Sequence, residues 1–158
     1  MLLKSEHGWR GAWQIFEWFV EDEPFNFQIN RAASYGPECF DLCEVRPLPT
    51  RIYGIESWNC VWMELARRAE KVHRFAHAVS YYRLAEFYLP DTASAKALCY
   101  QKFRTCFDLA YQGGEIERME VPFPGTFLPA LRLRAERERA VLVIHGGYDS
   151  FMERYAFV

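Results

Sequence analysis

The chain has 158 residues, of which 51% are hydrophobic and 25% are charged, and its formal net charge is −2. This balance is typical of a globular domain with a sizeable core, and it excludes an intrinsically disordered chain. The small net charge gives no reason to expect nucleic acid or an anionic membrane as a partner.

The sequence carries no targeting or membrane signal. Its first residues, MLLKSEHGWRGAW, include no long apolar stretch and no small-residue cleavage site. No run approaches the roughly 20 apolar residues that span a bilayer. Five cysteines, an odd number, occur without a secretory signal and are expected to be reduced thiols. We therefore expect a cytoplasmic protein that does not contact membranes.

The first expected element is a short amphipathic helix. Large apolar side chains recur there at steps of four and three, and acidic residues and Pro24 are expected to end the helix. Residues 24–54, which contain several prolines, are expected to form only short helical turns and loops. The apolar stripe of the first helix consists of Trp9, Trp13, Phe16 and Val20.

Three stronger helices are expected next. Ser57 is predicted to cap the first of them. Residues 78–89 are apolar nearly all round, which predicts a buried helix. The third helix is predicted to begin after Asp91 or Thr92 and to end at the glycine pair 113–114. The first stripe consists of Trp58, Trp62, Leu65, Ala69, Val72 and Ala76, and the third of Ala95, Cys99, Phe103, Phe107 and Ala110.

The periodicity changes after the glycine pair. Residues 115–121 and 127–134, separated by the turn PFPGT, predict a β-hairpin or meander. The continuous apolar run AVLVI, residues 140–144, predicts a strand covered on both faces, as in a parallel sheet. The expected fold class is therefore α/β, with a helical domain over residues 1–112 and the opening strands of a sheet over residues 113–158.

A glycine loop, HGGYD (145–149), follows this predicted strand. Ser150 and Glu153 have the spacing of a capping box, which predicts a helix from about Phe151. Glycines and free amides at a helix N-terminus stabilise negative charge. The sequence lacks the glycine patterns of nucleotide-binding loops. Two interpretations remain: an oxyanion hole of the HGG type, or a tight strand-to-helix turn with no chemistry.

A wider pattern favours the oxyanion hole. From Phe27 to Tyr155, the chain resembles one branch of the α/β-hydrolase superfamily. That branch includes relatives of the fermentation-respiration switch protein, fungal polyketide-shortening hydrolases and pseudooxynicotine-type carbon–carbon hydrolases. The resemblance rests on the order and spacing of GIESW (54–58), SYYRLAEFYL (80–89), YQKFRTCFDLA (100–110), IERMEVPFPGTFLPALRLR (116–134) and VLVIHGGYDSFMERY (141–155).

The resemblance implies a helical lid domain, then the first strands of the hydrolase sheet and its oxyanion loop. It implies that the backbone amides near Gly146, Gly147 and Tyr148 hold the oxyanion, and that His145 is not the catalytic base. The activity implied is cleavage of an ester, an amide or an activated carbon–carbon bond by a serine nucleophile. No cofactor and no metal are expected.

The catalytic triad is missing from this chain. In the superfamily the oxyanion loop precedes the G-x-S-x-G nucleophile, the acid and the histidine, and none of the six serines here lies in G-x-S-x-G. A small-molecule substrate is therefore expected only if the rest of a hydrolase completes the site.

Three explanations are open. The chain is a fragment of a longer hydrolase, one chain of a split enzyme completed by a second chain, or a non-catalytic helical interaction module. The last would form homo-oligomers through unpaired sheet edges. The sequence stops at Val158, within a helix expected to have barely begun, and this favours a fragment.

A zinc site is a further possibility. His73 and His77 are four apart on one predicted helix, and Cys39 and Cys43 have the same spacing. The tight C-x-x-C signature is absent, so surface histidines and buried thiols are the favoured interpretation.

Two other clusters have plain explanations. Trp58 and Trp62 can line a substrate pocket under a lid, but an aromatic stripe at helical spacing is more often core. A group of arginines is interrupted by Glu136 and Glu138, and this predicts a solvated turn rather than a basic patch. The arginines are Arg132, Arg134, Arg137 and Arg139.

Overall fold

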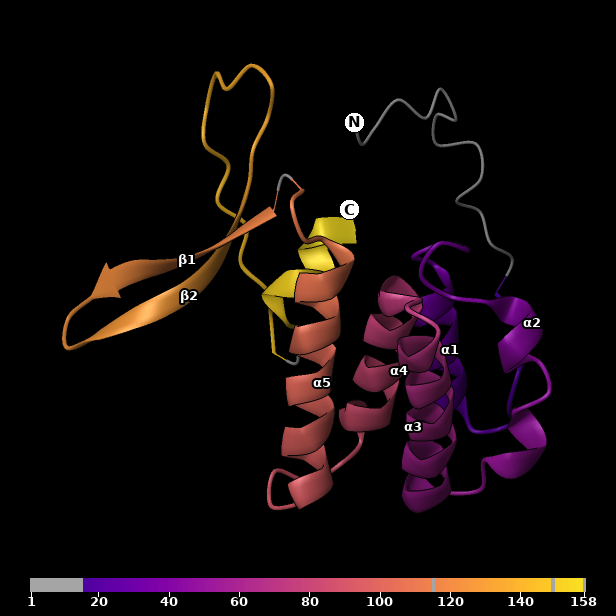
Figure 1. Cartoon of the computed structure of the whole chain (residues 1–158). Coiled ribbons are helices and arrows are strands. Elements are labelled where there is room, and N and C mark those ends of the chain that lie inside the picture. The colour runs from indigo at the N-terminus through magenta and orange to yellow at the C-terminus, as the bar shows by residue number, and fades with distance from the viewer. Residues whose placement is uncertain (1–15, 115, 149, 158) are drawn as a thin grey trace. The chain divides into compact units, whose positions relative to one another are not determined.

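The computed structural model describes residues 16–114, 116–148 and 150–157 (Figure 1). The chain divides into two compact units, Met1–Cys106 and Phe107–Val158. The boundary between them falls inside the last α-helix. In the described part of the chain, five α-helices precede a two-stranded antiparallel sheet, which confirms a mixed helix-and-sheet class.

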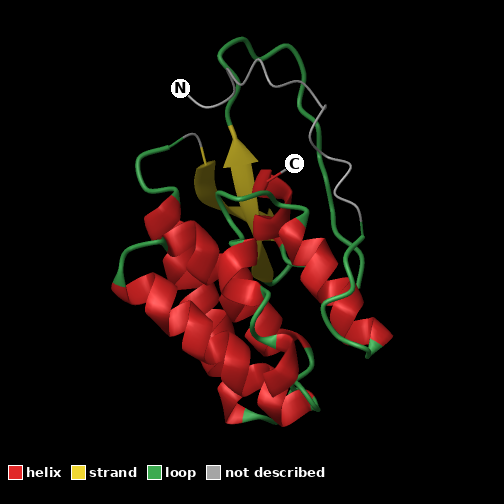
Figure 2. Cartoon of the chain, turned by 90° about the vertical axis from the view of Figure 1, so that its right-hand side faces the viewer, coloured by secondary structure: helices red, strands yellow, loops and turns green. Residues whose placement is uncertain are grey.

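The first unit is helical (Figure 2). Helices α3 and α4 pack against each other along their lengths, and α1 also contacts α4. Together they enclose an aromatic core. The elements are α1 (Glu23–Ala33), α2 (Leu42–Val45), the 3-10 turn η1 (Pro49–Arg51), α3 (Ile55–Lys71), α4 (Phe75–Phe87) and α5 (Ser94–Ala110), of which α5 crosses the boundary.

Pro24 begins a helix and does not end one, contrary to the prediction. The Asp22 carboxylate caps α1 by accepting a hydrogen bond from the Phe25 amide at 2.9 Å. Proline is well suited to a first helical turn, where its missing N–H would have no partner in any case. The stretch expected to hold only short turns therefore contains an 11-residue helix.

The prediction of a first helix is wrong for those of its residues that the structure describes. Residues 16–20 are not helical. They run beside α1 and are held by its asparagine side chains. Trp9 and Trp13, the other members of the predicted stripe, lie outside the described residues.

The tryptophan stripe of α3 is confirmed as core. Trp58 and Trp62 are fully buried, and their rings lie 5.4 Å apart. The indole N–H of Trp58 donates to the Leu84 carbonyl of α4 at 2.6 Å. Phe25 of α1 stacks on Trp58 at 4.6 Å, and Tyr81 of α4 stacks on Trp62 at 6.0 Å. These ring contacts join three helices into one core.

The ends of α3 differ from the prediction. The N-cap is Gly54, not Ser57. The Ser57 hydroxyl lies within the first turn, where it donates to the Gly54 carbonyl and accepts from the Tyr53 amide. The helix ends at Lys71, so Val72, which was expected to continue the apolar stripe, is exposed.

The β-hairpin of the second unit is confirmed. Strands β1 (Ile116–Phe123) and β2 (Thr126–Leu133) pair antiparallel, with Ile116 opposite Leu133. The turn contains Gly125 at φ 78°, a left-handed conformation that glycine adopts without steric cost. Most of the hairpin's side chains are exposed.

Two predictions for the end of the chain are wrong. Residues 140–144 form no strand in the described structure, and their side chains are exposed. The run has no neighbouring strand to pair with, and a strand buried on both faces cannot form without such neighbours. The last element is the 3-10 helix η2 (Met152–Phe157), not an α-helix from Phe151.

Candidate functional site

The predicted oxyanion loop lies on the surface of the second unit. Tyr148 is 97% exposed, and Gly147 is also exposed. The Ser150 amide donates to the Gly147 carbonyl at 3.3 Å, which closes a turn. Within the part of the chain that the structure describes, no hydrogen bond engages the amide of Gly147 or Tyr148. These two amides are free to bind an acceptor.

The two glycines of the loop have different surroundings. A Cβ at Gly146 would lie 2.5 Å from the Ser150 Cβ and 3.3 Å from the Tyr155 hydroxyl oxygen. A Cβ at Gly147 would meet nothing within 4 Å. Gly146 is therefore required by the close approach of the chain after the loop, whereas Gly147 faces open space.

The expected capping box does not form. Glu153 is 1% exposed, and its carboxylate accepts a hydrogen bond from Arg118 Nη1 of β1 at 2.8 Å. Arg118 Nε also donates to Asp108 of α5 at 2.6 Å, and the guanidinium lies over the Phe107 ring. Burial lowers the pKa of Arg118, but the two carboxylates outweigh burial and raise it. This ion-pair cluster fixes the turn that follows the glycine loop.

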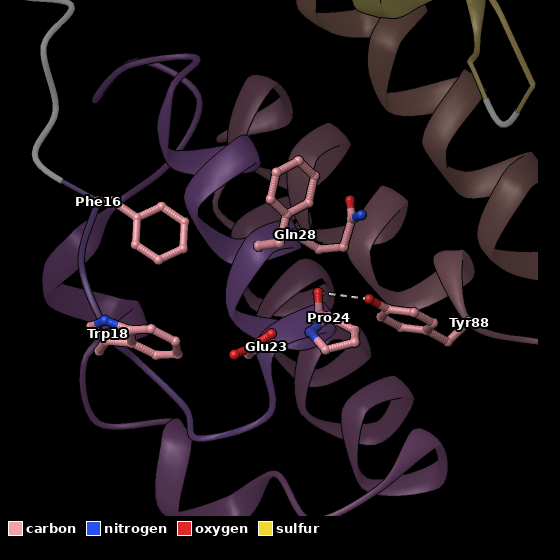
Figure 3. A pocket seen from close by; sticks show the side chains of 7 residues that line it. Phe16, Trp18, Glu23, Pro24, Gln28 and Tyr88 are labelled. Atoms are coloured by element: carbon pink, nitrogen blue, oxygen red, sulfur yellow. Dashed lines mark hydrogen bonds between the residues drawn. The ribbon is translucent and has the colours of Figure 1, made fainter.

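A pocket in the helical unit was not predicted from the sequence (Figure 3). Its volume is 610 Å³. It lies between the non-helical segment 16–20, the first turns of α1 and the end of α4. The lining residues are Phe16, Trp18, Glu23, Pro24, Phe27, Gln28 and Tyr88.

Two asparagines of α1 hold one wall of this pocket. Asn26 Oδ1 accepts from the amides of Phe19 at 2.7 Å and Val20 at 3.4 Å. Asn30 Oδ1 accepts from the Glu17 amide at 2.9 Å, and both asparagine side chains donate to the Glu17 carbonyl. These bonds keep segment 16–20 extended along α1.

Another wall of the pocket is formed by Tyr88, which is half-buried. The Tyr88 hydroxyl donates to the Pro24 carbonyl at 2.8 Å, and its ring lies edge-on to Phe25 at 5.0 Å. Burial, with a smaller contribution from the charge of Asp22, raises the pKa of Tyr88 to about 12. Tyr88 therefore stays neutral and orders the entry into α1.

Two tyrosine–carboxylate pairs link the helices of the first unit. The Tyr81 hydroxyl donates to Glu44 at 2.9 Å, and Arg74 pairs with the same carboxylate at 2.7 Å. The Tyr82 hydroxyl donates to Glu70, which also pairs with Lys102. Burial is the largest contribution to the raised pKa of both tyrosines. Their neutral hydroxyls act as hydrogen-bond donors that hold helices together.

The zinc hypothesis depended on a helix that the structure divides. His73 lies in the turn after α3, at φ 59°, whereas His77 lies on α4. No cluster of three or more potential metal ligands occurs among the residues that can be described. All five cysteines are free thiols, and burial raises the pKa of Cys106 to about 11. The buried thiols of Cys99 and Cys106, whose pKa burial raises, are not activated nucleophiles.

The arginine group is solvent-exposed, as predicted, and two of its members form ion pairs. Arg132 pairs with Glu138, and Arg134 pairs with Glu117 at 2.8 Å. Both members of each ion pair are exposed. Screened pairs of this kind contribute little to stability.

Comparison with protein-family models, with curated proteins and with solved structures returned no match. No described helix is both long enough and apolar enough to cross a bilayer.

Proposed function

We propose that this chain is the N-terminal, lid and oxyanion-loop part of a cytoplasmic serine-nucleophile α/β-hydrolase. The complete enzyme cleaves an ester, an amide or an activated carbon–carbon bond. The proposal rests on one observation above all: an unpaired apolar segment leads directly into a glycine loop with two free amides.

The apolar segment consists of Val141, Leu142, Val143 and Ile144. These side chains are between 58% and 89% exposed. Each costs roughly 1.5–3 kcal/mol when it is left in water instead of being fully buried. Four such residues in succession are unfavourable on a finished surface, and strands on either side would bury them. This exposure supports the proposal that further polypeptide completes a sheet around residues 141–144.

The loop supplies the chemistry in this proposal. A serine outside this chain attacks the substrate carbonyl, and a histidine–acid pair moves the proton. Amides near Gly146, Gly147 and Tyr148 stabilise the negative charge that develops on the carbonyl oxygen. Loss of one such donor costs roughly 2.7–4 kcal/mol of transition-state stabilisation in comparable sites.

A fluorophosphonate probe tests this function on protein purified from the cells that make it. The probe is expected to label a serine in a G-x-S-x-G sequence that is covalently or tightly associated with residues 1–158. Gly147→Pro removes one amide hydrogen and is expected to slow labelling roughly 10²–10³-fold. Gly147→Ala is the matched control, because it keeps the amide and its Cβ meets nothing within 4 Å. Absence of any labelled serine would overturn the proposal.

The alternative is a non-catalytic helical interaction module that oligomerises through its sheet edges. One observation favours it: β1 and β2 pair only with each other in the described structure, so each leaves an open edge. Such edges are templates for pairing with another chain. This alternative predicts an oligomer of the 158-residue chain that no fluorophosphonate labels.

A further inference from the structure

The pocket of the helical unit contains exposed aromatic rings. Phe16, Trp18 and Phe27 are 51%, 63% and 56% exposed, although each could bury a large apolar area. The Phe16 and Trp18 rings lie 5.7 Å apart with their planes at 82°, which forms a corner (Figure 3). Phe27 of α1 lines the same pocket. Aromatic faces carry negative electrostatic potential, and a cation gains most from contact with several faces at once.

The corner is preorganised by the backbone. Asn26 is fully buried, and with Asn30 it fixes the backbone of Glu17 and Phe19. Side chains alternate along an extended segment. Phe19 therefore points into the core, and Phe16 and Trp18 point outward into the pocket. A site held in this way loses little entropy when a ligand binds.

The charge of the pocket is negative. Among the described residues that line it, Glu23 is the one charged side chain. Among the residues that the structure describes, no lysine or arginine pairs with this carboxylate. Glu21 and Asp22 precede it directly. Arg31 donates to Gln28 at 3.4 Å but is not among the lining residues. A carboxylate that pairs with no described lysine or arginine, beside aromatic faces, suits a monovalent cation.

We propose that this pocket binds a small organic cation that carries a methylated ammonium group. A methylated ammonium presents apolar, positively polarised methyl groups to the ring faces. A quaternary ammonium has no N–H donors and is held by its charge and its methyl groups, contacts that a carboxylate and aromatic faces supply. Glu23 balances the charge. A bare divalent metal does not suit the pocket, because it needs several oxygen ligands. The inference does not depend on the proposed hydrolase function.

Isothermal titration of the full 158-residue chain with choline tests the proposal. The control ligand is 3,3-dimethylbutan-1-ol, which has the shape of choline without its charge. Choline is expected to bind saturably and roughly 3- to 30-fold more tightly than the alcohol, the range expected for a cation–π contact. Equal affinities, or no saturable choline binding, would overturn the proposal.

Matched variants locate the binding site. Glu23→Gln and Trp18→Leu are each expected to weaken choline binding roughly 3- to 30-fold. Glu21→Gln removes a neighbouring carboxylate that does not line the pocket, and Trp18→Phe keeps a ring, so both are expected to bind within about 3-fold of the unmodified chain. Circular dichroism confirms folding. Unchanged choline binding by Glu23→Gln and Trp18→Leu would overturn the assignment to this pocket.

A lipid headgroup offers the same chemistry as free choline. Vesicles of phosphatidylcholine are therefore tested by co-sedimentation with the chain. We expect no retention on vesicles together with saturable binding of free choline. Retention on vesicles without binding of free choline would overturn the assignment to a small soluble ligand.

Discussion

At the scale of single residues, alanine substitutions at the two glycines of the surface loop, Gly146 and Gly147, are expected to have different effects. Gly146→Ala forces a Cβ against the Ser150 Cβ, at 2.5 Å before relaxation, and the backbone must shift. Gly147→Ala places its Cβ in open space. We expect Gly146→Ala to speed amide hydrogen exchange across residues 150–156, and Gly147→Ala to leave it unchanged. Equal exchange in the two variants would contradict the described turn.

His77 gives a prediction about pH. Burial is the largest cause that lowers its pKa below 6.5, and the charge of Arg74 adds to it, whereas Glu44 and Asp41 act in the opposite direction. A histidine with a lowered folded-state pKa stabilises the fold while neutral, and this contribution is lost as the pH falls below 6.5 toward the folded-state value.

We therefore expect the urea midpoint of the helical unit to fall between about pH 7.5 and about pH 5.5. In His77→Gln this fall should be smaller. His73→Asn is the control, because His73 is exposed and asparagine tolerates its positive φ. If the urea midpoint of His77→Gln depends on pH in the same way as that of the unmodified chain, the burial of His77 does not cause the loss of stability at low pH.

At the scale of elements, Arg118 joins α5, β1 and η2 within the second unit. Its guanidinium binds Asp108 and the almost fully buried Glu153. Removing one partner of a buried ion pair leaves an uncompensated charge, which costs roughly 3–5 kcal/mol. The position of η2, and with it the end of the glycine loop, therefore depends on this residue.

Arg118→Met tests this dependence. Methionine keeps much of the apolar stem of arginine and removes the charge. We expect the amides of residues 152–156 to exchange faster with deuterium by one or more orders of magnitude, because the local opening energy falls by roughly 3 kcal/mol. Arg132→Met, which removes an exposed pair with Glu138, is the control and should leave these amides unchanged. Slow exchange in Arg118→Met would contradict the role of the cluster.

Some elements were predictable from the sequence and others were not. Helices α3, α4 and α5 and the hairpin were predicted because apolar periodicity and turn residues are local signals. Helix α1 was missed because Pro24 is compatible with both the end and the start of a helix. The Asp22 cap and the apolar spacing of Phe25 and Ile29 were the signals that could have found it.

Of the two candidate sites, one could be found from the sequence and the other could not. The glycine loop was found as a motif, because its residues are consecutive. The aromatic pocket was not found, because Phe16 and Trp18 line one pocket with Phe27 and Tyr88 only after segment 16–20 runs back along α1. The spacing of Phe16 from its apolar neighbours predicted a helix. The hydrogen bonds of Asn26 to the backbone of this segment outweigh that helical preference.

At the scale of the whole molecule, the exposed segment 141–144 is expected to promote self-association of the isolated chain. Val141→Glu with Val143→Glu is expected to reduce self-association of the isolated chain in sedimentation velocity, because less apolar surface remains to be buried. The thermal midpoint of the helical unit should not change. Arg137→Gln with Arg139→Gln lowers the net charge by the same two units in a neighbouring exposed segment and is the control. An equal reduction in the control would assign the effect to charge alone.

The central claim is that residues 1–158 belong to a hydrolase whose triad lies in further polypeptide. Native mass spectrometry of the protein from the cells that make it, with the denatured intact mass alongside, tests this claim most directly. We expect a longer polypeptide or a second bound chain, with G-x-S-x-G in the additional sequence. A homo-oligomer composed only of the 158-residue chain would contradict the hydrolase proposal and support the interaction module.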